Sequence, residues 1–324
     1  MTFISCKKKF AIDSVSRLFA ALALVCAMLL PLPPAQAQSR YEYHSDYFSF
    51  VGTDDKGLVA FAMDNNRGRA AERYQAEHFV KLYDQLQGWV SIRGNGDYVN
   101  AEKQLKRVPD SADFSFTGDA ENGLKISSQT NAIVLSIPAV TKIVFTTNDE
   151  GTYWLGAGPA TMHWKERTIR GRLIYEFLHW SRFNRLAGKS PGRFKNFNGF
   201  YLKTADGSDF YLHYRENDRL HLTGKQTGFG TWRGAAPISS VGFQITEHHI
   251  ALGVYRWPAA WSGQFHYKGT AYRFELKTVH RDTVRNWVIG GFAMAIVEGE
   301  ITSVDGRQRI AAVSYTHLRA HETQ

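Results

Sequence analysis

Short apolar runs separated by turn residues dominate the chain. Aromatic and β-branched residues are concentrated in segments such as 43–50, 133–137 and 141–146. Alternation of apolar and polar positions over such short lengths is typical of strands with one buried face. Asn-Gly or Asp-Gly pairs at 95–96, 122–123, 206–207 and 305–306 separate several runs and favour tight turns. We therefore predict an all-β protein, built as a barrel or a sandwich.

Further runs extend this ladder of strands. They cover 57–63, 199–203, 209–215, 220–223, 241–245, 250–255 and 272–276, and residues 89–93 and 97–100 form a predicted hairpin around Asn95-Gly96. The segment 74–84 has apolar residues at helical spacing as well, and we predict a strand there because its neighbours are strands. Gly290 and Gly291 interrupt an apolar run and predict a bulge or a bend.

The basic segment 180–197 differs from the strands around it. It contains several Arg and Lys residues together with Gly188 and Pro191. We predict an exposed linker between two β lobes, and a lid or an anion site is the alternative.

The first 37 residues have the pattern of a signal peptide. Three lysines at 7–9 precede an apolar run at 18–30, and Ala35-Gln36-Ala37 is a cleavage site of the A-x-A type. The run is too short to span a membrane. We expect a periplasmic or secreted protein with no membrane span after cleavage. Residues 313–324 resemble the translated read-through of a sequencing adaptor, so we expect the natural sequence to diverge after Ala312.

Composition excludes some classes of function. Between residues 38 and 312 there are 34 basic and 28 acidic residues, spread along the chain. Nucleic-acid binding usually requires a concentrated basic patch, so we expect no nucleic-acid partner. Both cysteines, Cys6 and Cys26, lie in the predicted signal peptide. A mature chain would therefore contain no disulfide and no cysteine ligand for zinc. No cofactor is implied, and the sequence does not determine an oligomeric state.

The predicted catalytic residues are Glu176 and His179. Glu176 stands in the apolar strand 173–178, where burial would raise the pKa of a carboxyl group and make it a proton donor. The structural alternatives are a core pair with Arg170 or Arg172, or a carboxylate facing solvent. Three aromatic residues near this strand could stabilise a cation or line a ligand site: Trp164, Tyr175 and Trp180.

Two further polar segments are candidate ligand contacts. Asp64 and Asn65 follow an apolar strand, where they form either the mouth of a barrel or a structural loop. Arg256 and Trp257 stand in an aromatic-rich segment and would stack on a ligand or on each other. His213 and His221 could face each other across a hairpin, but zinc needs a third ligand, so no metal site is predicted.

Three segments together resemble the lipocalin-like carotenoid 1,2-hydratase family, also called AttH-like. They are 251–258, 286–292 with 297–300, and 172–176. The resemblance spans about residues 45–310 and implies two consecutive lipocalin-like β-barrel domains, which we place at 38–185 and 186–312. Better-known members act on isoprenoid or polyene substrates by hydration or cyclisation. The acidic, Trp-containing motif around the proton donor of the hydratases is missing here.

The leading hypothesis is an exported protein that binds an apolar small molecule, such as an isoprenoid or a lipid, in a barrel cavity. As an enzyme it would be a hydratase or an isomerase or cyclase that protonates an alkene through Glu176. One alternative is a non-catalytic carrier with the same fold. Another is a carbohydrate-active protein with two carboxylates in an open cleft.

Overall fold

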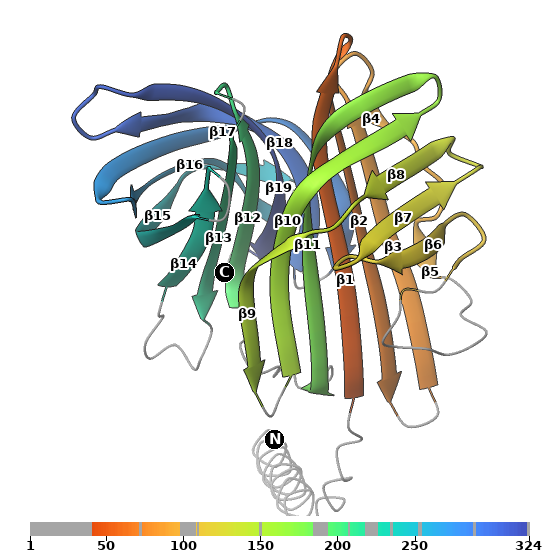
Figure 1. Ribbon diagram of the computed structural model, residues 1–324. Coiled ribbons are helices and arrows are strands. Elements are labelled where there is room, and N and C mark those ends of the chain that lie inside the picture. The colour runs from red at the N-terminus through yellow and green to blue at the C-terminus, as the bar shows by residue number, and fades with distance from the viewer. Residues whose placement is uncertain are drawn as a thin grey trace, which may run out of the picture. The chain divides into compact units, whose positions relative to one another are not determined.

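Two β-sheets, formed by consecutive parts of the chain, make up the part of the protein that the structure describes (Figure 1). The structure is a computed structural model that describes residues 41–70, 73–97, 108, 110–148, 151–183, 194–206, 208–217, 226–233, 236–251, 255–287 and 290–322. Residues 40–324 belong to one compact unit. Among the described residues, none forms a helix of the length and apolar character needed to cross a membrane.

The first sheet has eleven strands, paired in the order β4-β3-β2-β1-β11-β10-β8-β7-β6, with β5 beside β3 and β9 beside β10. Its strands are β1 (Tyr41–Asp54), β2 (Gly57–Ala70), β3 (Arg73–Asp84), β4 (Gly88–Val90), β5 (Gly96–Asp97), β6 (Ser115–Asp119), β7 (Gly123–Ser128), β8 (Ile133–Ile137), β9 (Thr141–Asn148), β10 (Gly151–Trp164) and β11 (Arg167–Phe183).

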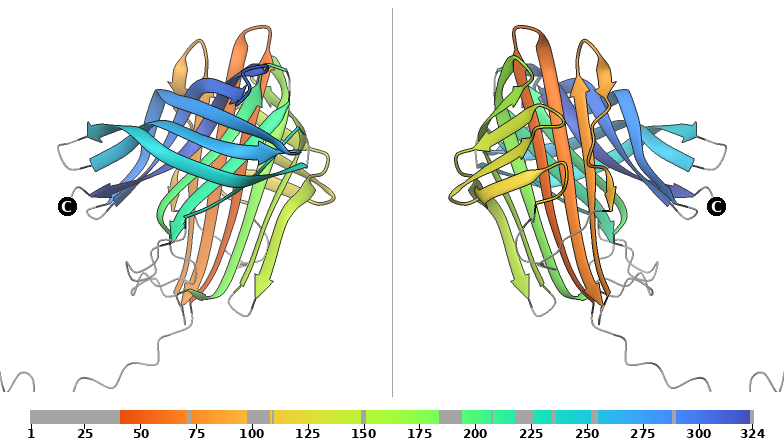
Figure 2. Two further views of the ribbon diagram at one scale, coloured as in Figure 1. Left: turned by 90° about the vertical axis from the view of Figure 1, so that its left-hand side faces the viewer. Right: turned by 90° about the vertical axis from the view of Figure 1, so that its right-hand side faces the viewer.

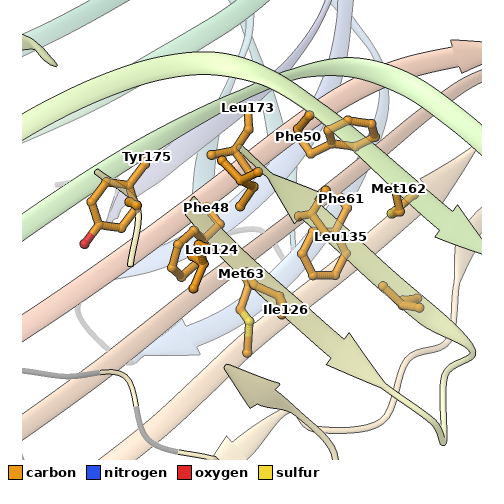
Figure 3. Close-up of a cluster of buried hydrophobic side chains, with 14 of the residues drawn as sticks. Phe48, Phe50, Phe61, Met63, Leu124, Ile126, Leu135, Met162, Leu173 and Tyr175 are labelled. Atoms are coloured by element: carbon orange, nitrogen blue, oxygen red, sulfur yellow. The ribbon is translucent and has the colours of Figure 1, made fainter. Parts of the chain in front are cut away.

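This N-terminal sheet curls around an apolar core (Figures 2 and 3). Side chains from the long strands, such as Phe48, Phe61 and Leu173, pack against Ile126 and Leu135 of β7 and β8. We call the face of the sheet that covers this core its inner face. Burying each large apolar side chain contributes about 1.5–3 kcal/mol, so the core stabilises the curl.

The second sheet is a closed barrel of the strands from β12 to β19 in sequence order. They are β12 (Phe194–Thr204), β13 (Asp209–Asn217), β14 (Gln226–Trp232), β15 (Ala236–Ala251), β16 (Tyr255–Tyr267), β17 (Thr270–Trp287), β18 (Gly290–Ser303) and β19 (Arg309–Glu322). Trp232, Trp261 and Phe265 are buried in its core. The expected all-β fold of two consecutive lipocalin-like β-barrel domains is confirmed, with the first sheet open and the second closed.

A third cluster of buried residues joins the two sheets. Ala60, Leu155 and Ile174 from the outer face of the N-terminal sheet pack against residues of β12, β13 and β18 that include Tyr201 and Met294. Lys81 of β3 also forms an ion pair with Asp282 of β17. The outer face of the N-terminal sheet is therefore a contact surface within the same chain.

Several sequence predictions are confirmed and others are wrong. The ambiguous segment 74–84 is a strand, and the turns at 122–123 and 305–306 join paired strands. The hairpin around Asn95-Gly96 is wrong, because β4 and β5 both pair with β3. The Asn95 side chain accepts a hydrogen bond from the Val80 amide at 2.7 Å, which ties this loop to β3 as well.

Two corrections concern strand lengths from residue 180 onward. Residues 241–245 and 250–251 belong to the one strand β15. Gly290 and Gly291 begin β18 and pair with Trp287 and Asn286 of β17, so the bulge or bend expected there lies at the end of a hairpin. Residues 180–183 and 194–197 belong to β11 and β12, so the predicted linker is shorter at both ends. The rest of the linker and the strand expected at 220–223 lie outside the described residues.

The suspected read-through segment takes part in the barrel. Residues 313–318 of β19 pair with β12, and 313–320 pair with β18. Closure of the second sheet as described therefore depends on these residues.

Candidate functional site

Strand alternation places Glu176 and Tyr175 on opposite faces of β11. Tyr175 belongs to the inner apolar core. Glu176 points to the outer face, where tyrosines of the second sheet contact its carboxylate. Trp164 is also in the inner core. The structure therefore separates Glu176 from Tyr175 and Trp164, which were predicted to lie together.

Three tyrosine hydroxyls donate hydrogen bonds to the Glu176 carboxylate. Tyr153 on β10 donates to Oε1 at 2.6 Å, and Tyr211 on β13 donates to the same oxygen at 3.4 Å. Tyr201 on β12 donates to Oε2 at 3.3 Å. Two of these three donors come from the closed barrel, so the carboxylate lies where the two sheets meet.

A second carboxyl group shares this face. Tyr47 of β1 pairs with Glu176 on one side and with Asp64 of β2 on the other. With neighbouring strands about 4.8 Å apart, the two acids flank Tyr47 across about 10 Å of sheet. Ser45 Oγ donates a hydrogen bond to Asp64 Oδ1 at 2.8 Å. We call Glu176, Asp64 and the tyrosines at 47, 153, 201 and 211 the acid–tyrosine cluster.

Both acids of this cluster hold their protons more tightly than usual. Burial raises the pKa of Glu176, and hydrogen bonds from the tyrosines offset only part of that effect. Burial raises the pKa of Asp64 to about 6, against the hydrogen bond from Ser45. Burial also raises the pKa of Tyr211 well above its usual value, so this hydroxyl stays protonated. Perturbed acids in one cluster are typical of sites of proton transfer.

A small cavity lies beside the cluster. Its volume is about 30 Å³, and its lining includes Ser49, Arg172, Ile174, Tyr201 and Phe210. Ile174 precedes Glu176 by two positions on the same face of β11, and Tyr201 touches the Glu176 carboxylate. A space of this volume holds about one water molecule.

The inner face holds a separate, fully buried chain of polar groups. Tyr175 donates a hydrogen bond to Asp46, and Arg67 contacts both Asp46 and Asn65. Asn65 in turn contacts His78. Burial and the charge of Arg67 lower the pKa of His78 to about 3, so its ring is neutral at neutral pH. We call these five residues the inner polar chain.

His179 lies at one end of the inner face, away from the acid–tyrosine cluster. In the pairing of β1 with β11 it stands opposite His44, and the two rings stack with centroids 4.2 Å apart. Its Nε2 is 3.5 Å from a carboxylate oxygen of Glu42. Burial, followed by the effect of His179, lowers the pKa of His44 to about 4.

The remaining predicted residues are dispersed. Asn65 belongs to the inner polar chain, although its neighbour Asp64 belongs to the acid–tyrosine cluster. Trp257 is buried in the barrel core, and the guanidinium of Arg281 lies 5.9 Å from its ring centre. The side chains of Trp180, Arg256 and His213, and the whole of His221, lie outside the described residues.

Sequence reasoning missed the four tyrosines of the cluster, because each stands in a different strand and only the pairing of strands brings them together. It also missed Glu42 and His44. The signal available for that pair was the i, i+2 spacing on one strand, which places both side chains on the same face.

Comparison with known proteins identifies a solved structure that shares the fold of this chain. No protein-family model matches the chain, and no curated protein matches its sequence. Kievitone hydratase from Nectria haematococca is 10% identical, with a TM-score of 0.45, and the match covers 90% of this chain and 93% of that one. CghA is also 10% identical, with a TM-score of 0.47 and coverage of 87% and 88%. An AttH candidate from Nitrosomonas europaea is 12% identical, with a TM-score of 0.50 over 90% of this chain and 98% of that one, and it shares the fold described above.

Proposed function

We propose that the protein transforms an apolar small molecule by general-acid chemistry at the acid–tyrosine cluster. The observation that carries this proposal is the Glu176 carboxyl group, which has a raised pKa and lies among hydroxyl groups and apolar side chains. A carboxylic acid that keeps its proton in apolar surroundings can deliver that proton to an alkene. The fold shared with the AttH candidate agrees with the family resemblance of the sequence.

Each group of the cluster has a role in such a reaction. Glu176 donates its proton to one carbon of the alkene, and a carbocation forms at the other carbon. The rings of Tyr47, Tyr201 and Tyr211 stabilise that cation through their negative faces. Water then adds its oxygen to the cation and Asp64 accepts the released proton, which gives a hydrated product. In a cyclisation an internal double bond attacks the cation, and the new cation that results loses a proton to Asp64. In an isomerisation the first cation loses a proton to Asp64 directly.

The surroundings of each acid suit its role. A pKa of about 6 leaves the Asp64 carboxyl group largely ionised at neutral pH and able to accept a proton. The hydroxyls of Tyr153, Tyr201 and Tyr211 stabilise the Glu176 carboxylate after it has given up its proton. Solvent then restores the proton of Glu176 for the next turnover.

Substrate must enter by movement of side chains between the two sheets. The cavity of about 30 Å³ accommodates a water molecule, whereas binding sites for small organic molecules measure about 300–1,000 Å³. Ile174, Leu202 and Phe210 line the cavity and are the side chains that would have to part. The apolar residues around the cluster suit an isoprenoid or another lipid. They count against a carbohydrate, which would need an open polar cleft.

The export signal expected at residues 1–37 places this reaction in the periplasm or outside the cell, and this location is part of the proposal. A fusion of those residues to a reporter that is active only outside the cytoplasm tests it directly. Loss of reporter activity on replacing the apolar run at 18–30 with polar residues is the expected control result.

The test of the reaction is incubation of the purified protein with a host lipid extract in ¹⁸O-labelled water, followed by mass spectrometry of bound and free lipids. A hydrated product carries one labelled oxygen, and an isomerised or cyclised product keeps the mass of the substrate but changes its retention time. Glu176→Gln should abolish turnover and keep binding. Glu166→Gln, in an exposed turn on the same sheet, is the matched control and should remain fully active.

Three outcomes contradict the proposal in different ways. A Glu176→Gln protein that turns over substrate normally shows that Glu176 is not the acid. A Glu176→Gln protein that fails to fold assigns the residue a structural role. A lipid that binds in one copy per chain and is recovered unchanged under all conditions identifies a carrier.

A further inference from the structure

We propose that Glu42, His44 and His179 form a binding site for a divalent transition-metal ion, with zinc as the expected occupant. The site is on the inner face of the N-terminal sheet, so it is separate from the acid–tyrosine cluster and does not depend on the proposed function. Nothing in the sequence analysis predicted it.

The three residues meet because of strand pairing. His44 and His179 are direct partners in the antiparallel pairing of β1 with β11. Glu42 is two positions before His44, so alternation places its side chain on the same face. The three side chains therefore project from two hydrogen-bonded strands, whose register shifts between Tyr41 and Tyr43. Strands hold ligands more precisely than a loop does.

The distances between the three donor atoms fit a metal ion. Glu42 Oε1 is 3.2 Å from His44 Nε2 and 3.5 Å from His179 Nε2. One donor atom from each of the three residues lies within 4.8 Å of the other two. Ligand atoms that each lie about 2.0–2.2 Å from a tetrahedral zinc ion are about 3.3–3.6 Å apart. The two contacts of Glu42 Oε1 are within or close to that range.

The surroundings favour an occupant at this point. His179 Nε2 is buried and makes no hydrogen bond among the described residues, although it lies 3.5 Å from a carboxylate oxygen of Glu42. Arg69 contacts the other oxygen of Glu42, Oε2, at 3.0 Å. That contact fixes the carboxylate and leaves Oε1 directed at the two imidazoles, as an outer partner of a metal ligand does.

Charge and access are also compatible with a cation. Glu42 supplies one negative charge, and the nearby positive charge of Arg67 is compensated by its ion pair with Asp46. The side chains of Glu42 and His179 are each 28% exposed, so an ion can enter from solvent. Two imidazole nitrogens and one carboxylate oxygen suit zinc, and they leave a fourth position for water or for a ligand.

The test uses the whole chain, stripped of metal with a chelator and then titrated with zinc chloride in a calorimeter. We expect one zinc ion per chain. Since loss of an outer partner alone lowers metal affinity by about 10–100-fold, replacing a ligand should lower it by at least about 100-fold. His179→Gln and Glu42→Gln are the variants, because both side chains are partly exposed and their replacement should leave the fold intact. Urea unfolding in the presence of chelator checks that it does.

A control variant and a second readout make the result specific. His163→Gln removes an exposed histidine whose ring contacts Thr168, and it should keep the full affinity and stoichiometry. Cobalt in place of zinc should give visible absorption of the strength typical of four-coordinate geometry, and His179→Gln should lose it. The proposal is overturned if the wild-type chain binds no zinc at micromolar concentrations, or if both ligand variants bind zinc as tightly as the wild type does.

Discussion

Replacement of Asp64 by Asn should stabilise the folded protein at neutral and alkaline pH but not at acidic pH. Burial raises the pKa of Asp64 to about 6, from an ordinary value of 3.8. The unfolded chain ionises this group freely above that ordinary value, while the folded chain must pay a desolvation cost to do so. An asparagine side chain at this position has nearly the same shape and cannot ionise. Its amide oxygen can still accept the hydrogen bond from Ser45.

The size and sign of the effect follow from the two pKa values. Below about pH 3 the carboxyl group is protonated in both states, so Asp64→Asn should change the free energy of unfolding little. Between pH 4 and 6 the folded state holds a proton that the unfolded state has lost, so wild-type stability from this group falls as pH rises. Above pH 7 the full cost is expressed. A pKa difference of about two units, at about 1.4 kcal/mol per unit, gives about 3 kcal/mol as the upper value.

The pH dependence of the wild type alone would not reveal this cost. The pKa values of His44 and His78 are lowered to about 4 and about 3. Their unfolded forms take up protons near pH 6.5, so their contribution to stability is present above that pH and is lost as pH falls. This trend is opposite to that of Asp64 and overlaps it. The difference between variant and wild type cancels the histidines and reports Asp64 together with the effect of its charge on Glu176.

The assay is urea unfolding of both proteins at pH 4, 5, 6, 7 and 8. Asp119→Asn is the matched control, because Asp119 is exposed and hydrogen bonds from Asn122 lower its pKa. The difference between this control and the wild type should be constant between pH 5 and 8. The reasoning is refuted if Asp64→Asn is no more stable than the wild type at pH 8, or if its gain in stability is the same at pH 4.

Three further predictions concern the fold. Tyr175→Phe removes the hydroxyl that donates a hydrogen bond to the buried Asp46. The free energy of unfolding in urea should fall by about 1–3 kcal/mol. An unchanged unfolding midpoint would contradict the role of the inner polar chain. Gly171→Ala would place a Cβ atom against the Val51 carbonyl oxygen, well inside van der Waals contact, so β1 and β11 could not pair, and we expect loss of soluble protein on expression. Truncation after Ala312 removes most of the part of β19 that pairs with β12, so the barrel should open. We expect a lower melting temperature and tryptophan fluorescence typical of solvent-exposed side chains. An unchanged melting temperature would show that this part of β19 is dispensable.

The overall architecture could be predicted from local patterns because each strand carries its own signal. Alternation in segments such as 133–137 fixes which side chains are buried without knowledge of any partner. Turn pairs such as Asn122-Gly123 mark where the chain reverses, and Gly123 indeed has a positive φ of 121°. The failure at Asn95-Gly96 has the same origin, since a turn dipeptide does not say which strand its flanks will pair with.

The candidate site was only partly predictable, because proximity there depends on pairing between strands distant in sequence. The raised pKa of Glu176 was expected from its apolar neighbours in the sequence, but the burial that raises it comes from the contact between the two sheets. Its three tyrosine partners could not be anticipated, since Tyr201 and Tyr211 belong to the other sheet. His179 was predicted as a catalytic neighbour of Glu176, but its contacts are His44 and Glu42.

Adjacent residues in a strand serve different sites, and this property organises the chemistry of the N-terminal sheet. Asp64 and Asn65 are neighbours in sequence, yet the first faces the tyrosines at the second sheet and the second lies in the inner polar chain. Tyr175 and Glu176 are divided in the same way. One sheet can therefore carry the proposed proton-transfer site on one face and the proposed metal site on the other, because the sheet itself keeps the two sets of charges apart. It follows that the effect of a substitution is predicted by the face on which the residue lies rather than by its sequence neighbours.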